Sequence, residues 1–273
     1  MATSKNVQTP SQESLVDFDD PPINEVVCGV GFRNLDRFIT PYVGLWWSEI
    51  QKEFPAARKA DPIFGYAEKD TVPIFERTTF VSKDGTQMIQ LQPTRFYYNW
   101  IKSQEKQTYP RYSQVYKSFA EWLAKFTQFV TANDIGEIDR FEYNMTYVNL
   151  IPQGQGWSSL KDIQKVLPDI SWKKSRKRKY ISEPADFNFR YVFPIKEQPG
   201  RVTATIQRGI RKADQVSVLR FELAAQATIA DGLPEYTEKS MAQWFDAARE
   251  AIVLGFLDLT DEQVQIKYWG RRD

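Results

Sequence analysis

The sequence predicts an α+β fold of two similar halves, each an antiparallel sheet with a long amphipathic helix packed across one face. Two long segments carry apolar side chains at i, i+3 and i+4 spacing, as helices that cover a sheet do. Alternating apolar and polar runs joined by turn residues precede each of these helices, which is typical of antiparallel meanders. The order of elements repeats at a period of roughly 115–120 residues, which suggests a structural duplication without residue-level identity.

The first half spans residues 21–136 and follows a polar tail, residues 1–20, that we expect to be disordered. The Asp84-Gly85 pair lies between two extended runs and is typical of a hairpin turn. The pattern predicts a strand at 23–32, a helix at 41–54, a connection at 57–75, a second hairpin arm at 87–100 and a helix at 111–132.

The second half spans residues 137–273 and contains a basic insertion at about 168–185. A helix is expected after Thr237, where apolar residues again recur at helical spacing. The remaining elements predicted here are a long strand at 138–151, a short helix at 158–167, strands at 186–194, 201–211 and 215–229, and a last short strand at 264–269.

Composition excludes several classes of chemistry. The 273 residues include one cysteine, Cys28, and no histidine. Catalytic triads, histidine-ligated metals and histidine pH switches are therefore excluded, as are intramolecular disulfides and thiolate clusters. Carboxylate, lysine or tyrosine chemistry remains open, and we expect no cofactor and no metal.

The sequence pattern predicts neither a signal peptide nor a membrane-spanning helix. The polar start is not a signal peptide, and no run approaches the ~18–20 apolar residues that a spanning helix needs. We therefore expect a cytoplasmic protein that does not contact a membrane.

Charge is segregated along the chain. Residues 153–220 hold 15 basic and 6 acidic residues, a net charge of +9, whereas the rest carries −8. Such a region, with aromatic side chains among its cations, is typical of nucleic-acid binding. A solvated loop beside an acidic half of the protein, or an interdomain contact, is the commoner explanation of such a region, and the pI of about 7.7 is low for a dedicated nucleic-acid binder. The candidate residues are Trp172, Lys173, Lys174, Arg176, Lys177, Arg178, Lys179, Arg201, Arg208 and Arg211.

Three glutamates lie inside predicted strands, namely Glu25, Glu142 and Glu222. A carboxylate buried in a strand must be paired, because burying it alone costs several kcal/mol. Strand alternation places Arg220 on the same face as Glu222, and Arg95 is another possible partner. Two such glutamates could act as general acid and base, but structural ion pairs are commoner.

Two further patterns involve strand residues. Arg95, Tyr97 and Asn99 share one strand face, which could bind a carboxylate or phosphate or could satisfy backbone groups. Gly29 and Gly31 lie within the first strand, but no third glycine opens a following helix, so they do not form a dinucleotide-binding loop.

Several segments together resemble a sporadically distributed family of uncharacterised prokaryotic proteins. They are PPINEVVCGVGF (21–32), PYVGLWWSEIQKEFP (41–55), LQPTRFYYNW (91–100) with YPRY (109–112), MTYVNLIP (145–152) and LTDEQVQIKYWG (259–270). The resemblance supplies no activity, cofactor or catalytic residue to transfer. The patchy distribution of the family is similar to that of mobile or defence-linked genes.

Three functions are compatible with these patterns. The first is a non-enzymatic binding or regulatory protein acting through a protein partner, as an accessory or neutralising component of a toxin or antiphage defence operon. The alternative is a nucleic-acid or nucleotide-binding protein that uses the basic region 172–212. The third is a carboxylate-dependent enzyme that uses the strand glutamates. The oligomeric state stays open.

Overall fold

Strands from both halves of the chain join one antiparallel sheet, a point that the sequence left open. The computed structural model describes residues 15–63, 77–104, 107–171, 179–181, 184, 186–211 and 213–272. The sheet has nine strands in the order β3-β4-β5-β6-β2-β7-β10-β9-β8. Their bounds are β2 Ile23–Phe32, β3 Ala56–Ala60, β4 Arg77–Val81, β5 Gln87–Gln92, β6 Arg95–Ile101, β7 Arg140–Pro152, β8 Asn188–Pro194, β9 Arg201–Ile210 and β10 Ser217–Thr228.

The two halves follow one another with a similar order of elements, although the first meander has four strands and the second has three. The first contains β2, helix α1 (Thr40–Ile50), the meander β3–β6 and helix α2 (Tyr112–Ala132). The second contains β7, a 3-10 helix (Leu160–Lys165), the meander β8–β10, a 3-10 turn (Ile229–Asp231) and helix α3 (Glu238–Leu259). The opening strands β2 and β7 pair with each other at the centre of the sheet. The predicted α+β class is confirmed, and the two-half domain boundaries remain a prediction.

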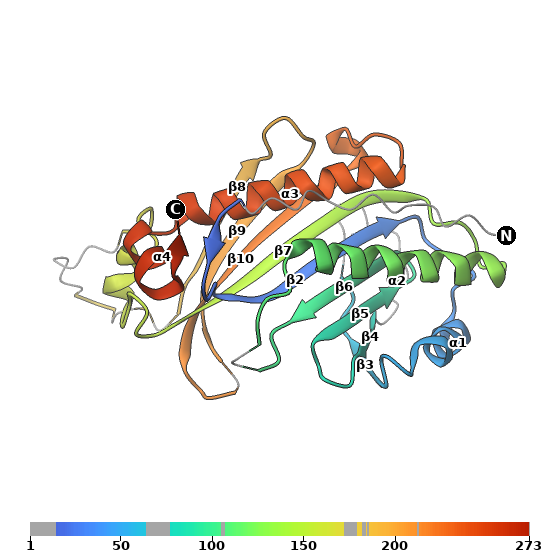
Figure 1. Ribbon diagram of the computed structural model, residues 1–273, viewed down its shortest axis with the longest axis horizontal. Coiled ribbons are helices and arrows are strands. Elements are labelled where there is room, and N and C mark those ends of the chain that lie inside the picture. Colours follow the sequence, from blue (N-terminus) through green and yellow to red (C-terminus); the bar gives the residue numbers. More distant parts are fainter. Residues whose placement is uncertain are drawn as a thin grey trace.

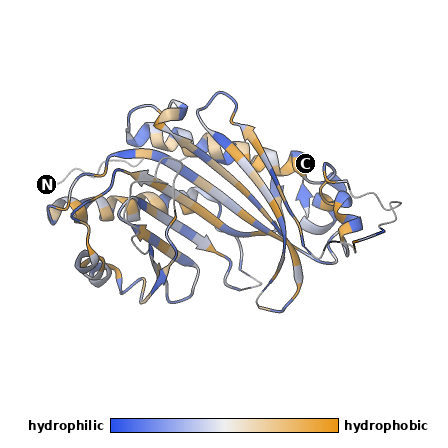
Figure 2. Ribbon diagram, turned by 180° about the vertical axis from the view of Figure 1, so that it is seen from behind, coloured by the Kyte–Doolittle hydropathy of each residue, from blue (hydrophilic) through white to orange (hydrophobic). Residues whose placement is uncertain are grey.

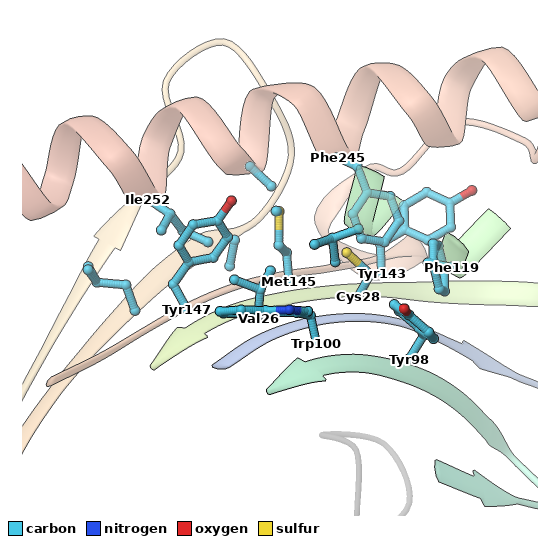
Figure 3. Packing of buried hydrophobic residues seen from close by; sticks show 14 of the residues in the cluster. Val26, Cys28, Tyr98, Trp100, Phe119, Tyr143, Met145, Tyr147, Phe245 and Ile252 are labelled. Atoms are coloured by element: carbon cyan, nitrogen blue, oxygen red, sulfur yellow. The ribbon is translucent and has the colours of Figure 1, made fainter. Parts of the chain in front are cut away.

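Helices α2 and α3 lie side by side on the same face of the sheet (Figure 1). Helix α2 packs on β6 and β2, and α3 packs on β10 and β7. Their apolar stripes meet the inward-facing side chains of these strands, such as Val26, Cys28 and Met145, which are fully buried (Figure 3). This aromatic-rich layer is the core of the protein.

The opposite face of the sheet carries the polar half of each alternating strand. Figure 2 shows this side, with the sheet in front of the helices. On β10, for example, Arg220, Glu222 and Gln226 are half-buried, whereas Phe221, Leu223 and Ala225 are buried against the helices. We call this surface the polar face.

The C-terminal segment differs from its prediction. Residues 264–269, expected to be a strand, lie in helix α4 (Glu262–Trp269). Asp261 caps this helix by accepting a hydrogen bond from the backbone N–H of Val264, and Gly270 ends it with a φ of 63°. The alternating pattern was misleading because these local caps, together with burial of Trp269, favour the helix.

Two other predictions differ in extent. The tail expected to be disordered up to residue 20 contains a short strand β1 (Asp17–Phe18), which pairs with β11 (Arg271–Arg272). The connection expected at 57–75 begins with β3, an edge strand of the sheet. Both strands depend on partners distant in sequence, and local patterns do not show such partners. In the described part of the chain, no helix is long and apolar enough to cross a bilayer.

Candidate functional site

A buried ion pair joins Arg95 on β6 to Glu142 on β7 across the polar face. The guanidinium donates two hydrogen bonds to the carboxylate, at 2.7 Å to Oε1 and 3.0 Å to Oε2. Both side chains are at most 2% exposed. Gln226 donates to the same carboxylate at 2.9 Å, and Arg201 donates to Gln226 at 3.2 Å. Polar side chains thus connect β6, β7, β10 and β9.

Two glycines of β2 leave room for side chains on this face, Gly31 for the ion pair and Gly29 for Tyr97. Strand β2 lies between β6 and β7, so the pair must cross it. A Cβ on Gly31 would lie 3.0 Å from Cβ of Glu142 and 3.3 Å from Nη1 of Arg95. A Cβ on Gly29 would lie 2.0 Å from the ring of Tyr97. The glycine pair therefore leaves room for side chains from the neighbouring strands.

A second row of hydrogen bonds ends at Glu25. Arg77 donates to Gln90, Gln90 donates to Asn99 at 2.8 Å, and Asn99 donates to Oε1 of Glu25 at 2.5 Å. The row crosses β4, β5, β6 and β2. Burial raises the pKa of Glu25, and the Asn99 hydrogen bond and the charge of Arg220 only partly oppose that rise.

The pairing of Arg220 with Glu222, expected from strand alternation, is confirmed. Nη2 of Arg220 lies 2.5 Å from Oε2 of Glu222, and both side chains are partly exposed. Arg95, the other possible arginine partner for the strand glutamates, pairs with Glu142. Each of the three strand glutamates is therefore engaged by an arginine or by an amide, and Glu142 is closed off from solvent.

The candidate nucleic-acid residues are only partly described. Residues 172–178, with Trp172, Lys173, Lys174, Arg176, Lys177 and Arg178, lie outside the described ranges. Lys179 is described and exposed. Arg201 is 3.6 Å from Asp231, Arg208 donates to Ser217, and Arg211 forms an ion pair with Asp214 at 2.5 Å.

Strand alternation separates two of these arginines. Arg201 is on the polar face, whereas Arg208 lies opposite Leu219, a core residue on the helix-covered face. The structure therefore does not bring the β9 arginines into one patch.

Strands β8 and β3 form the two edges of the sheet. On β8, Val192 is 47% exposed and Phe193 is 40% exposed, and Phe193 stacks on Tyr191 with ring centroids 6.2 Å apart. On β3, the exposed central positions are Ala57, Arg58 and Lys59. Charged edges discourage pairing with other chains, whereas apolar edges favour it.

The helix-covered face contains a cavity of about 450 Å³ that sequence reasoning missed. It lies beneath α3 and the start of α2, with β7 and β10 as its floor. Its lining residues are Val16, Asp17, Phe18, Pro21, Pro22, Ile23, Tyr109, Arg111, Tyr112, Ser113, Tyr147, Asn149, Leu223, Arg249, Ile252, Val253 and Phe256.

A polar cluster lies within this apolar surround. The hydroxyls of Tyr109 and Tyr147 are 2.9 Å apart, and Tyr147 rises from β7 toward α3 beside Ile252 (Figure 3). Asn149, which is 3% exposed, lies on the same side of β7 and donates to the carbonyl of Phe221 at 3.3 Å. The sequence signal that could have revealed this cluster is Asn149, because it places a polar amide at a core-facing position of a predicted strand.

Comparison with known proteins does not identify a function for these sites. No family model and no curated protein matches the chain. Among solved structures, the di-domain ARO/CYC StfQ from the steffimycin biosynthetic pathway is 9% identical and aligns over 86% of this chain and 96% of its own, with a TM-score of 0.21. So low a score supports no conclusion about fold or function.

Proposed function

We propose that this protein is a non-enzymatic binding protein that acts through a partner protein held at the outer edge of β8. The observation that supports this proposal is the edge itself. Val192 and Phe193 are exposed there, and within the described residues no further strand pairs with the outer side of β8. An extended segment of a partner can add to such an edge by main-chain hydrogen bonds, with alternate side chains giving specificity.

The surrounding charge indicates the chemistry of the partner segment. Strand β8 lies inside the region 153–220, whose net charge is +9, and Arg190 is exposed at its centre. An acidic segment with alternating apolar side chains would complement both the cations and the exposed Val192 and Phe193. A toxin or defence effector encoded in the same operon is the partner that we propose, in the cytoplasm.

The carboxylates support binding over turnover. A general acid and base must reach substrate, and Glu142 is buried within its ion pair with Arg95. Glu222 is neutralised by Arg220, and Glu25 accepts a hydrogen bond from Asn99. Glu142 and Glu25 therefore hold neighbouring strands together, whereas the Glu222 ion pair lies within β10.

The test compares two edges of the same sheet. The tagged full-length chain is purified from its native cells, and a co-purifying protein is produced separately for affinity measurement. The double variant Val192→Lys/Phe193→Lys should weaken that affinity at least tenfold, because it places charge on the apolar edge. Ala57→Lys, on the opposite edge strand β3, should leave it unchanged.

Two results would refute the proposal. One is the absence of any protein that co-purifies above a mock preparation. The other is equal affinity in the β8 variant and its β3 control, with circular dichroism showing that both are folded.

A nucleic-acid-binding function is the second candidate, and the net charge of +9 on residues 153–220 favours it. It predicts that affinity for a single-stranded RNA falls steeply between low and moderate salt. Joint neutralisation of Lys173, Lys174, Arg176, Lys177, Arg178 and Lys179 should then abolish binding. Binding that is unchanged in that variant, or undetectable in the parent at low salt, would exclude this function.

A further inference from the structure

The cavity beneath α3 has the size of a small-molecule site. Its volume of about 450 Å³ falls within the range of roughly 300–1,000 Å³ that ligand pockets occupy. Much of its wall is apolar, with Leu223 from β10 and Ile252, Val253 and Phe256 from α3. Such a wall suits the hydrocarbon or aromatic body of a ligand.

The tyrosine pair offers a hydrogen-bond donor to that ligand. Each phenol has one proton, so within the pair one O–H donates to the other oxygen and the second O–H is left over. Neither hydroxyl has another hydrogen-bond partner among the described residues. The pair is partly buried and lines the cavity, where a ligand oxygen would accept the remaining hydrogen bond.

The protonation state of the pair is fixed by its surroundings. Burial raises the pKa of Tyr109 and of Tyr147 well above that of a free phenol. Both side chains therefore stay neutral and remain donors throughout the physiological range of pH.

Positive charge lies close to the same hydroxyls. The guanidinium of Arg249 lines the cavity 5.2 Å from the ring centroid of Tyr112, and its charge acts on the pKa of both Tyr109 and Tyr147. Arg111 also lines the cavity, where it forms an ion pair with Asp17 at 3.1 Å. A second carboxylate, Asp246, lies at the edge of the cavity and accepts a hydrogen bond from the lining residue Tyr112 at 2.9 Å, so Arg249 and Arg111 are the cations that a ligand oxygen could meet there.

We infer that the cavity binds a monoanionic organic acid, with the carboxylate at the Tyr109–Tyr147 pair beside Arg249 and the apolar body against α3. Neutral phenolic donors and a nearby guanidinium together favour an anionic oxygen over a neutral one. This site lies on the helix-covered face of the sheet and is independent of the partner edge on β8.

The experiment is calorimetric titration of the full-length protein with octanoate and 2-naphthoate, each compared with its neutral amide. At least one carboxylate should bind at sub-millimolar concentration, and at least about tenfold more tightly than its amide. Tyr147→Phe retains the ring and removes the donor, so it should weaken carboxylate binding by about tenfold. Arg249→Gln should abolish the preference for the carboxylate.

Two further variants separate binding at this cavity from other effects. Tyr143→Phe removes a hydroxyl from the same strand outside the cavity and should leave affinity unchanged. Val253→Trp fills the cavity and should eliminate binding in a protein that still unfolds cooperatively. Absence of saturable binding by both carboxylates, or equal affinity in the parent and the Tyr147→Phe and Arg249→Gln variants, would overturn the inference.

Discussion

At the scale of single residues, the two glycines of β2 decide what the polar face can hold. Because Gly29 and Gly31 have no side chains, the ring of Tyr97 and the Arg95–Glu142 pair can lie over the central strand. Local sequence could place these residues on one face, but it could not show that the glycines face them. That relation depends on the register of β6, β2 and β7.

Gly29→Ala tests this arrangement. The new Cβ would lie 2.0 Å from Cδ1 of Tyr97, so the variant should lose about 1–3 kcal/mol in the free energy of unfolding measured in urea. Removing the ring in the double variant Gly29→Ala/Tyr97→Ala should recover part of that loss. In a double-mutant cycle, the two changes should therefore be non-additive.

Gly44→Ala provides the control, because no atom lies within 4 Å of a Cβ at that helical position. It should be neutral or slightly stabilising. Equal stability of the two alanine variants would show that Tyr97 does not require the glycine.

Glu25 should make the stability depend on pH in an unusual direction. Burial raises its pKa in the folded protein above the ordinary glutamate value of 4.5, so the folded state binds this proton more tightly than the unfolded state. Its contribution therefore favours folding below about pH 4.5 and is lost as the pH rises through the folded-state pKa.

Glu25→Gln isolates this contribution from the other carboxylates. The stability of the variant relative to the parent should rise as the pH rises from 4 to 7, measured by urea unfolding at each pH. The glutamine can still accept the hydrogen bond from Asn99, which limits other effects. A difference independent of pH would contradict the raised pKa.

At the scale of elements, the sequence predicted those helices whose signals are local and long. The stripe at 111–132 corresponds to α2, and the helix expected after Thr237 corresponds to α3. It could not predict strand β3, which is short and charged and becomes a strand by pairing with β4. It predicted a strand where α4 lies, because the alternation over residues 264–268 concealed the helix caps on either side.

The start of α3 provides a test at this scale. The hydroxyl of Thr237 accepts a hydrogen bond from the backbone N–H of Ser240, and Ser240 reciprocates in a capping box. Thr237→Ala should cost about 1 kcal/mol in the free energy of unfolding. Lys239→Ala, an exposed neighbour, should change it by less than about 0.5 kcal/mol, and equal costs would argue against the cap.

At the scale of the whole molecule, the pairing of β2 with β7 joins the two halves through the centre of one sheet. Each half therefore exposes a long strand edge when it is separated from the other. The cavity depends on both halves as well, since its floor comes from β7 and β10 and its covering segment from residues 16–23. The sequence could not predict this cavity because its lining converges from distant segments.

The halves should consequently not fold alone. Fragments 21–136 and 137–273 are expected to lack cooperative thermal transitions separately and to regain native circular dichroism when mixed. The intact chain should unfold in a single transition followed equally by circular dichroism and tryptophan fluorescence. A cooperative transition in either isolated fragment would show that it is an independent domain.

The pairing of β1 with β11 has a consequence for chain connectivity. Asp17 lies opposite Arg272, so a short peptide linking residues 272 and 15 would need no rearrangement of the sheet. A chain closed in this way could be opened between residues 136 and 137, which would place the second half before the first. The fold is thus compatible with a circular permutation, and the new link would hold Asp17 and Phe18 in place as one wall of the cavity.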